Sequence, residues 1–118
     1  MLIHEAAAVT ELTIDAIRYY ERQHLLDERH ITRQLNGYRS YTPAAIQRLQ
    51  HLKHARAQGY TVAELRNLTR AYDAGRLGAN ERRVFLKGKI ARIARQIASL
   101  EAMRSSFERE LSQLRNAE

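Results

Sequence analysis

The sequence predicts a mainly α-helical chain with one short hairpin and a long coiled-coil helix in its C-terminal part. Apolar residues recur at the three-to-four-residue spacing of amphipathic helices in several segments before residue 74. The dipeptide Asn36-Gly37 lies in a basic stretch between these segments and is typical of a hairpin turn. From residue 81 onward the apolar residues follow a heptad pattern. We therefore expect three parts: residues 1–74, a linker at 75–80 and a coiled-coil helix at 81–118.

Two short helices are expected first. An alanine-rich helix at residues 4–9 is followed by a second helix, for which Thr13 is a suitable N-cap. Ile14 and Ile17 mark the buried stripe of this second helix. Four side chains fall on its opposite face: Asp15, Arg18, Tyr19 and Arg22. Arginine pairs bidentately with guanine edges or phosphates, and tyrosine adds a flat surface and a hydroxyl, so the face favours nucleic-acid contact. The alternative is an ordinary solvated helix face.

The hairpin is predicted around Asn36-Gly37, because both residues of a two-residue hairpin turn take positive φ. Tyr38 and Tyr41 on its C-terminal side are strand-prone. Three arginines surround the turn with charge: Arg29, Arg33 and Arg39. A hairpin cannot bury its own backbone, so it must pack on helices or on a ligand. The alternative is an ordinary surface hairpin, but the arginines favour one that contacts phosphate.

Two further helices precede residue 74. Thr42-Pro43 opens the third, which ends at Gly59, a residue suited to the left-handed conformation after a helix. Thr61 opens the fourth and forms a capping box with Glu64. The exposed N–H groups at such a helix start can hold a phosphate, so Tyr60 and Thr61 are candidate phosphate contacts.

The last helix carries a narrow apolar seam. One heptad position holds Ile90, Ile97, Arg104 and Leu111, and the other holds Ile93, Leu100, Phe107 and Leu114. A helix of about 36 residues spans roughly 54 Å and needs a partner helix to cover this seam. The preceding helices are too short to do so, which favours a homodimer over an intramolecular partner. Arg104 in a core position is typical of a residue that fixes register, and Asn80 is the expected N-cap.

Charge and composition narrow the function. The net charge of +7 suits a polyanionic partner, although a merely soluble basic protein would share it. No apolar run approaches the roughly 20 residues of a membrane span and no signal peptide is evident, so a cytoplasmic protein is expected. No nucleophile–base pattern, glycine-rich phosphate loop or acidic pair predicts an enzyme or a cofactor. His51 and His54 have metal-ligand spacing but lack further ligands nearby, so no metal is expected.

Three motifs together resemble the MerR family of bacterial transcription regulators. They are T-I-D-A-I-R-Y-Y-E-R at residues 13–22, N-G-Y-R-S-Y at 36–41 and G-Y-T-x-x-E-L at 59–65, and the resemblance covers most of residues 1–70. It implies a winged helix-turn-helix DNA-binding domain, a second helix pair, and a dimerisation helix that pairs antiparallel with its partner. It also implies a palindromic promoter operator that is distorted on binding, with RNA polymerase as a further partner.

The sequence departs from the family pattern in the turns and in the sensor. Glu11 and His24 stand where the family usually has glycine, so either the turns differ or stability is lost. Many relatives sense soft metals or redox state through cysteine thiolates, and the chain has no cysteine, which excludes that chemistry. Three aromatic residues are the only candidates for a signal pocket between the dimer helix and the partner's second helix pair: Tyr60, Tyr72 and Phe85.

These observations favour a sequence-specific DNA-binding regulator of transcription that acts as a homodimer on double-stranded DNA. The first alternative is an architectural or excisionase-like protein that bends DNA without an effector, which binding without a sequence motif would favour. The second is a coiled-coil interaction protein whose basic domain docks an acidic protein. Insensitivity of its function to Arg18→Ala and Tyr38→Ala would favour that second alternative.

Overall fold

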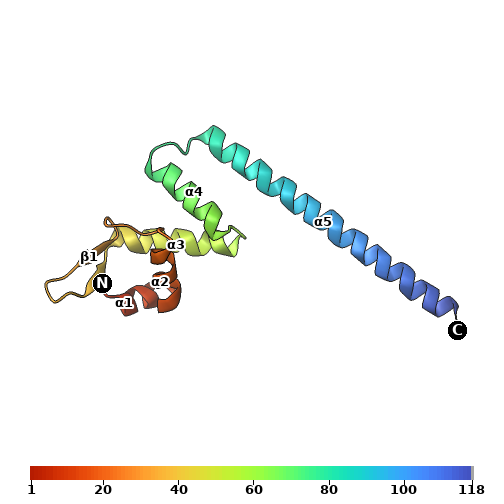
Figure 1. The fold of residues 1–118 in the computed structure, drawn as a ribbon, viewed down its shortest axis with the longest axis horizontal. Helices are drawn as coiled ribbons and strands as arrows, with labels where there is room; N and C mark the ends of the chain where they lie inside the picture. The colour runs from red at the N-terminus through yellow and green to blue at the C-terminus, as the bar shows by residue number, and fades with distance from the viewer. Residues whose placement is uncertain (118) are drawn as a thin grey trace. The chain divides into compact units, whose positions relative to one another are not determined.

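The computed structural model describes residues 1–117 and divides the chain into two compact units, Met1–Arg76 and Leu77–Glu118. The elements of unit 1 are α1 (Ile3–Thr10), α2 (Ile14–Arg22), β1 (Ile31–Arg33), β2 (Arg39–Tyr41), α3 (Pro43–Ala57) and α4 (Val62–Asp73) (Figure 1). Unit 2 holds the single helix α5 (Ala79–Asn116). The predicted mainly α-helical fold with one hairpin and a long last helix is confirmed.

One apolar core holds unit 1 together. It is formed by α1, α2, β2, α3, α4 and the segment after α2, through Ala6, Ile17, Tyr20, Leu25, Leu26, Tyr41, Ala45, Leu49, Leu52 and Leu65. Helix α1 contacts α2, α3 and β2, so the first helix lies at the centre of these packing contacts. The predicted inward stripe of α2 is confirmed at Ile17, which is fully buried, whereas Ile14 is half-buried. The core therefore fixes which face of α2 is left for solvent.

Threonine caps start three of the helices, as predicted. The hydroxyl oxygens of Thr13, Thr42 and Thr61 each accept a hydrogen bond from the backbone N–H three residues further on, at 3.0, 3.2 and 3.1 Å. The Glu64 carboxylate accepts from the Thr61 N–H at 2.9 Å and completes the predicted capping box. Gly59 takes a φ of 89° directly after the C-cap of α3, as its predicted role requires.

The expected cap of the last helix is wrong. The N-cap of α5 is Gly78, so the helix begins at Ala79, and Asn80 lies inside its first turn. An N-cap residue needs extended backbone, which Gly78 supplies with φ −85° and ψ −179°. The Asn80 side chain instead accepts a hydrogen bond from Arg83 Nη1 at 2.7 Å.

The expected two-residue hairpin turn is also wrong. The strands pair antiparallel with Arg33 opposite Arg39, and a three-residue loop, Leu35 to Gly37, makes the turn. The Gly37 N–H donates to the Gln34 carbonyl at 2.9 Å, and the Gln34 N–H donates to the Tyr38 carbonyl at 2.8 Å. Gly37 has a φ of 83°, whereas Asn36 is not in the positive-φ region. This is a tight turn closed by a left-handed glycine, in which only one residue needs positive φ.

Glu11 and His24 both take left-handed backbone, with φ of 57° and 62°. The turns therefore keep the geometry that glycine would adopt, and the hypothesis that they differ is rejected. The left-handed region costs a residue with a Cβ on the order of 1–2 kcal/mol. Glu11 is the C-cap of α1, and Lys53 of α3 contacts this turn through the Thr10 carbonyl at 3.1 Å and Glu11 Oε2 at 3.4 Å.

Replacing either residue by glycine is expected to stabilise unit 1. We expect Glu11→Gly and His24→Gly each to raise the free energy of unfolding by roughly 0.5–1 kcal/mol, because the lost strain is partly offset by the greater freedom of the unfolded chain. Urea denaturation measures the change. Ala8→Gly, on the exposed face of α1, is the matched control and should lose about 1 kcal/mol. A loss of similar size for Glu11→Gly would show that the turn is not strained.

Candidate nucleic-acid interface

The solvent face of α2 carries the four side chains predicted to lie there. Asp15, Arg18, Tyr19 and Arg22 are all exposed, while Ile17 and Tyr20 on the opposite side are buried. The Arg22 guanidinium lies 5.9 Å from the centre of the Tyr19 ring, within range of a cation–π contact. An Arg–Tyr pair therefore stands on the exposed face of a helix whose opposite face packs against the core. Thr13 at its start is exposed, but its hydroxyl is already used as the cap.

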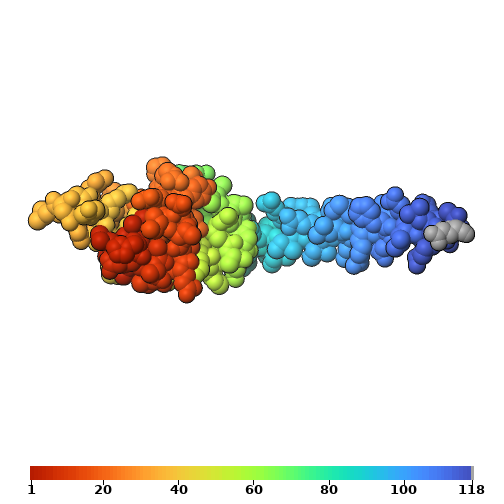
Figure 2. Space-filling view, turned by 90° about the horizontal axis from the view of Figure 1, so that it is seen from below, coloured from red at the N-terminus to blue at the C-terminus, as the bar shows by residue number. Residues whose placement is uncertain are grey.

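The hairpin of residues 31–41, here called the wing, is anchored at its base and exposed at its tip. Figure 2 shows it in orange and yellow, projecting from the helical part of unit 1. At the base, Tyr41 is 2% exposed, and its backbone exchanges hydrogen bonds with that of Met1 at 2.6 and 2.9 Å. At the tip, Leu35, Asn36, Gly37 and Tyr38 are exposed. The wing can therefore contact a ligand at its tip without giving up core packing.

A cleft of about 380 Å³ lies between α2, the start of α1 and the wing. Arg18 of α2 lines it together with Arg33 and Arg39 of the wing, so three arginines line one hollow. Gly37 and Tyr38 also line it, which brings together four of the predicted site residues from two separate segments. A cleft lined by one sign of charge concentrates the field there and attracts the opposite charge, here phosphate.

Five residues that line the cleft were not predicted as site residues, and Arg33 and His4 are the two basic ones among them. Arg33 had been counted only as part of the charge around the turn, and the antiparallel register is what sets it opposite Arg39. His4 carries no spacing signal, since its place beside the wing depends on the backbone bonds between Met1 and Tyr41. Only the tertiary fold therefore reveals these two residues.

The corner between α3 and α4 lies apart from this cleft. Neither Tyr60 nor Thr61 lines it, and Tyr60 is half-buried against the core. The Tyr60 carbonyl accepts from Arg56 Nη1 at 2.8 Å, and the N–H of Thr61 is used by Glu64. A carboxylate already occupies part of the helix start that was predicted to hold phosphate. The phosphate-contact role of this corner stays a prediction.

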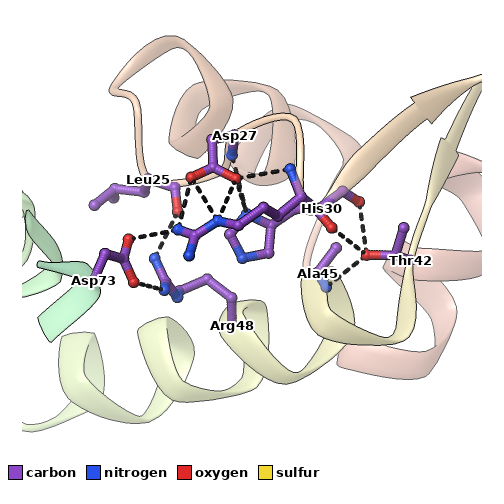
Figure 3. Close-up of polar contacts among 8 residues, drawn as sticks. Leu25, Asp27, His30, Thr42, Ala45, Arg48 and Asp73 are labelled. Carbon is purple, nitrogen blue, oxygen red and sulfur yellow. Dashed lines mark hydrogen bonds and ion pairs between the residues drawn. The ribbon is translucent and has the colours of Figure 1, made fainter. Parts of the chain in front are cut away.

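A polar junction lies where the segment after α2 meets α3 and α4 (Figure 3). Arg29 Nη2 lies 2.8 Å from Asp27 Oδ2 and 2.9 Å from Asp73 Oδ2, and Arg48 Nη2 lies 2.7 Å from Asp73 Oδ1. Arg48 also donates to the Leu25 carbonyl at 3.3 Å. Arg29, which was expected to face phosphate near the turn, is instead paired with two carboxylates of its own chain. The junction ties the base of the wing to the end of α4.

The junction encloses a buried histidine. His30 is 4% exposed, and its Nδ1 accepts a hydrogen bond from the Asp27 N–H at 3.0 Å. Burial lowers the pKa of His30 below its ordinary value, so the ring is neutral near pH 7 and Nδ1 can accept. The hydrogen bond from the Arg29 side chain lowers the pKa of Asp27 to about 2. Burial alone would raise the pKa of Asp73, but the bonds and charges of Arg48 and Arg29 outweigh it and lower that pKa.

The free energy of unfolding of unit 1 should therefore decrease in two steps as the pH is lowered. Because the pKa of His30 is lower in the folded chain than its ordinary 6.5, its stability contribution is complete above pH 6.5 and is lost as pH falls through the folded pKa. The contribution of Asp27 is complete above its ordinary pKa of 3.8 and is lost as pH falls toward 2. Urea denaturation at a series of pH values measures both. His30→Asn keeps an acceptor and should remove only the upper step; an upper step that survives this change would have another source.

The predicted seam of α5 is exposed in unit 2. The residues Ile90, Ile93, Ile97, Leu100, Phe107, Leu111 and Leu114 are all exposed, and no residue of α5 is buried. Arg104 Nε lies 3.6 Å from Glu108 Oε1, so the charge in the core position has a partner on its own helix. A row of large apolar side chains in water is unfavourable and needs a covering partner. Within residues 1–117, no helix is long and apolar enough to cross a membrane, and no group of three or more acidic or histidine side chains is placed to hold a metal.

Comparison with known proteins defines the class of this chain as a helix-turn-helix regulatory protein. The family described as "MerR HTH family regulatory protein" matches residues 1–72, and the family described as "MerR, DNA binding" matches residues 46–109. The HTH-type transcriptional regulator ZntR of Escherichia coli is 32% identical over 108 residues, which cover 91% of this chain and 75% of that protein. The HTH-type transcriptional regulator CueR of Escherichia coli is 36% identical over 108 residues, covering 91% and 78%. The chain belongs to the MerR family.

Solved structures agree with this assignment. The transcription regulator PbrR691 from Ralstonia metallidurans, solved in complex with lead(II), has a TM-score of 0.82 and 30% identity, covering 98% of this chain and 86% of that one. HiNmlR, described as a MerR family regulator lacking the sensor domain and bound to promoter DNA, has a TM-score of 0.66. At 21% identity, covering 86% and 75%, that likeness shows the fold alone. The resemblance seen in the sequence motifs is confirmed.

Proposed function

We propose that the chain is a homodimeric regulator that binds a palindromic promoter operator and distorts the DNA to control transcription. One observation carries the proposal: the exposed face of α2 and the wing flank a single cleft lined by Arg18, Arg33 and Arg39. A helix presented beside a basic wing can enter a major groove while the wing contacts the flanking backbone. The promoter DNA in the HiNmlR complex is the kind of ligand this arrangement suits.

The proposed DNA contacts fall in three groups. Helix α2 contributes base and phosphate contacts through Thr13, Asp15, Arg18, Tyr19 and Arg22. The wing contributes Asn36, Gly37, Tyr38 and Arg39, and the α3–α4 corner contributes Tyr60 and Thr61. Of these, Arg18 has the best position for reading a base, because it lies on the exposed face of α2 and also reaches the cleft. Bidentate pairing of Arg with guanine is the commonest specific contact in the major groove.

Dimerisation is proposed through the seam of α5, because a second copy would cover its exposed side chains. In an antiparallel pair the two DNA-binding units would read two halves of a palindrome. We propose RNA polymerase as a further partner, a cytoplasmic location and no catalytic role. The relatives here are described as transcriptional regulators, one of them as probably heavy metal-dependent. The 118 residues include no cysteine thiolate for such a metal, so we propose no thiolate-bound metal effector.

Selection from a random-duplex pool tests the proposal. The purified protein is incubated with the pool at two salt concentrations, and the bound sequences are read. We expect a palindromic consensus whose affinity falls steeply with salt, because the cleft neutralises phosphates and releases their counterions. Enrichment of no sequence, with binding lost as salt rises, would support the architectural alternative. Absence of DNA binding would support a protein partner.

Arg18→Ala is the variant that locates the base contact. If Arg18 reads a base, its loss costs about 1–3 kcal/mol on the selected site and relaxes preference at one position. If it contacts only phosphate, affinity should fall evenly across sequences. The matched control is Arg70→Ala, since Arg70 is exposed on α4 and lies outside the cleft. Equal binding by both variants would remove Arg18 from the interface.

The seam makes a separate prediction about assembly. Ile97→Asp places a charge at the centre of the apolar seam, so the dimer should dissociate, and binding to the full palindrome should weaken more than binding to a half-site. Analytical ultracentrifugation of the free protein gives the molecular mass. Ala98→Asp, one residue away on the side of α5 facing away from the seam, is the control and should remain a dimer. A monomeric wild-type protein would contradict the prediction.

A further inference from the structure

The wing carries two arginines that face each other but differ in their partners. Arg33 and Arg39 are directly opposite in the antiparallel register, so their side chains stand on the same face of the hairpin. Like charges in that position destabilise a strand pair. Arg39 Nη1 lies 2.6 Å from Glu21 Oε2, whereas no ion pair joins Arg33 to a carboxylate in the part of the chain that the structure describes. The two guanidinium groups are therefore not equivalent.

Glu21 holds β2 against the last turn of α2 through two contacts. Its Oε2 accepts from Arg39 Nη1, and its Oε1 accepts from the Tyr41 hydroxyl at 3.3 Å. Residues 39 and 41 lie two apart on one strand, so both side chains leave the same face and meet one carboxylate. The Glu21 side chain is 11% exposed, so water competes weakly for these bonds. Charge-assisted bonds to a shielded carboxylate are stronger than neutral ones.

The core fixes the position of Tyr41, the second partner of Glu21. Tyr41 is buried, and its backbone is bonded to Met1, so its hydroxyl has a set position. Burial, together with the Glu21 charge, raises the pKa of Tyr41, which keeps the phenol protonated and able to donate. The carboxylate thus links the strand of the wing to the helix that presents Arg18. The two Glu21 contacts therefore add to the contacts at the base of the wing in restraining it relative to α2.

We infer that Glu21 is a positioning residue that clamps the wing to α2, with Arg39 as its partner and Arg33 as the phosphate ligand of the wing. The inference rests on the proposed function and deepens it. It reassigns Arg39, proposed above as a DNA contact of the wing, to a structural role and gives the phosphate contact to Arg33. A fixed angle between α2 and the wing favours DNA in which the major groove and the flanking phosphates are separated by one particular distance. The clamp therefore acts on specificity, and Arg33 acts on general affinity.

Matched variants separate the two roles. Arg33→Met and Arg39→Met remove one charge each from facing positions of the same hairpin, and Glu21→Gln removes the charge of the clamp. Binding to the selected operator and to random duplex is measured over a range of salt. Arg33→Met should weaken both DNAs and lower the salt slope by about one phosphate contact. Glu21→Gln and Arg39→Met should weaken the operator roughly tenfold, the loss expected from one charge-assisted bond, and Arg39→Met should not lower the slope on random duplex as Arg33→Met does.

The effects of the Glu21 and Arg39 substitutions on operator affinity should not add, and this gives a second test of the clamp. The double variant Glu21→Gln with Arg39→Met should bind the operator no more weakly than either single variant, since both remove the same contact. If Arg39→Met lowers the salt slope as Arg33→Met does, while Glu21→Gln keeps full operator affinity, Arg39 is itself the phosphate ligand and the inference is wrong. Thermal melts confirm that each variant is folded. If the single variants do not fold, Glu21→Arg with Arg39→Glu restores the pair in reverse and should recover operator binding.

Hydrogen exchange without DNA tests the clamp independently of the proposed function. Backbone amides of residues 38–41 should exchange faster in Glu21→Gln and Arg39→Met than in the wild-type chain, and should be unchanged in Arg33→Met. Unchanged exchange in Glu21→Gln would overturn the clamp even if the protein binds an operator. Faster exchange in a protein that selects no DNA sequence would keep the clamp and refute the proposed function.

Discussion

The ion pairs among Asp27, Arg29, Arg48 and Asp73 are the constraint on which the geometry of the proposed DNA-binding face depends. Each strand of the wing has only three residues, and a two-stranded hairpin of that size is not stable alone in water. Its exposed tip adds nothing to the core, so its direction must be imposed from its base. The junction fixes that base to α3 and to the last residue of α4, while Tyr41 fixes it to α1. Removing Asp73 would leave the Arg48 guanidinium, whose side chain is 14% exposed, without a carboxylate partner, and such a loss costs more than the pair itself contributes.

Tertiary contacts also explain how the chain tolerates two strained turns. Glu11 and His24 close the turns on either side of α2, so the position of that helix depends on both left-handed residues. The cost of each is small compared with the burial of Ile17 and Tyr20 against the core. Lys53 also bonds the turn at Glu11 from the neighbouring helix. Packing therefore selects the turn geometry, and the residue type only sets how much stability remains.

Patterns in the sequence correctly predicted the features that depend on interactions within one segment of the chain. The threonine caps, the glycine end of α3, the exposed face of α2 and the apolar seam of α5 all follow from spacing within one segment. The turn length and the start of α5 were wrong because Asn is favoured in several neighbouring roles, and register or backbone geometry chooses among them. The partners of Arg29 and Arg39 could not be predicted, because Asp73 and Glu21 lie 44 and 18 positions away in the sequence. Helix and strand periodicity relates only residues a few positions apart, so it cannot predict these ion pairs.

The net charge of a basic interface does not show how many of its arginines are available to contact phosphate. Three arginines near the turn made phosphate contact attractive, yet two of them are bound to carboxylates of their own chain. A paired guanidinium contributes little to the long-range field and releases few counterions, because its charge is already neutralised. Within residues 1–117, Arg18 on α2 and Arg33 on the wing have no carboxylate partner, and both line the same cleft. The pairing of charges within the protein, more than their number, therefore decides which residues remain available to DNA.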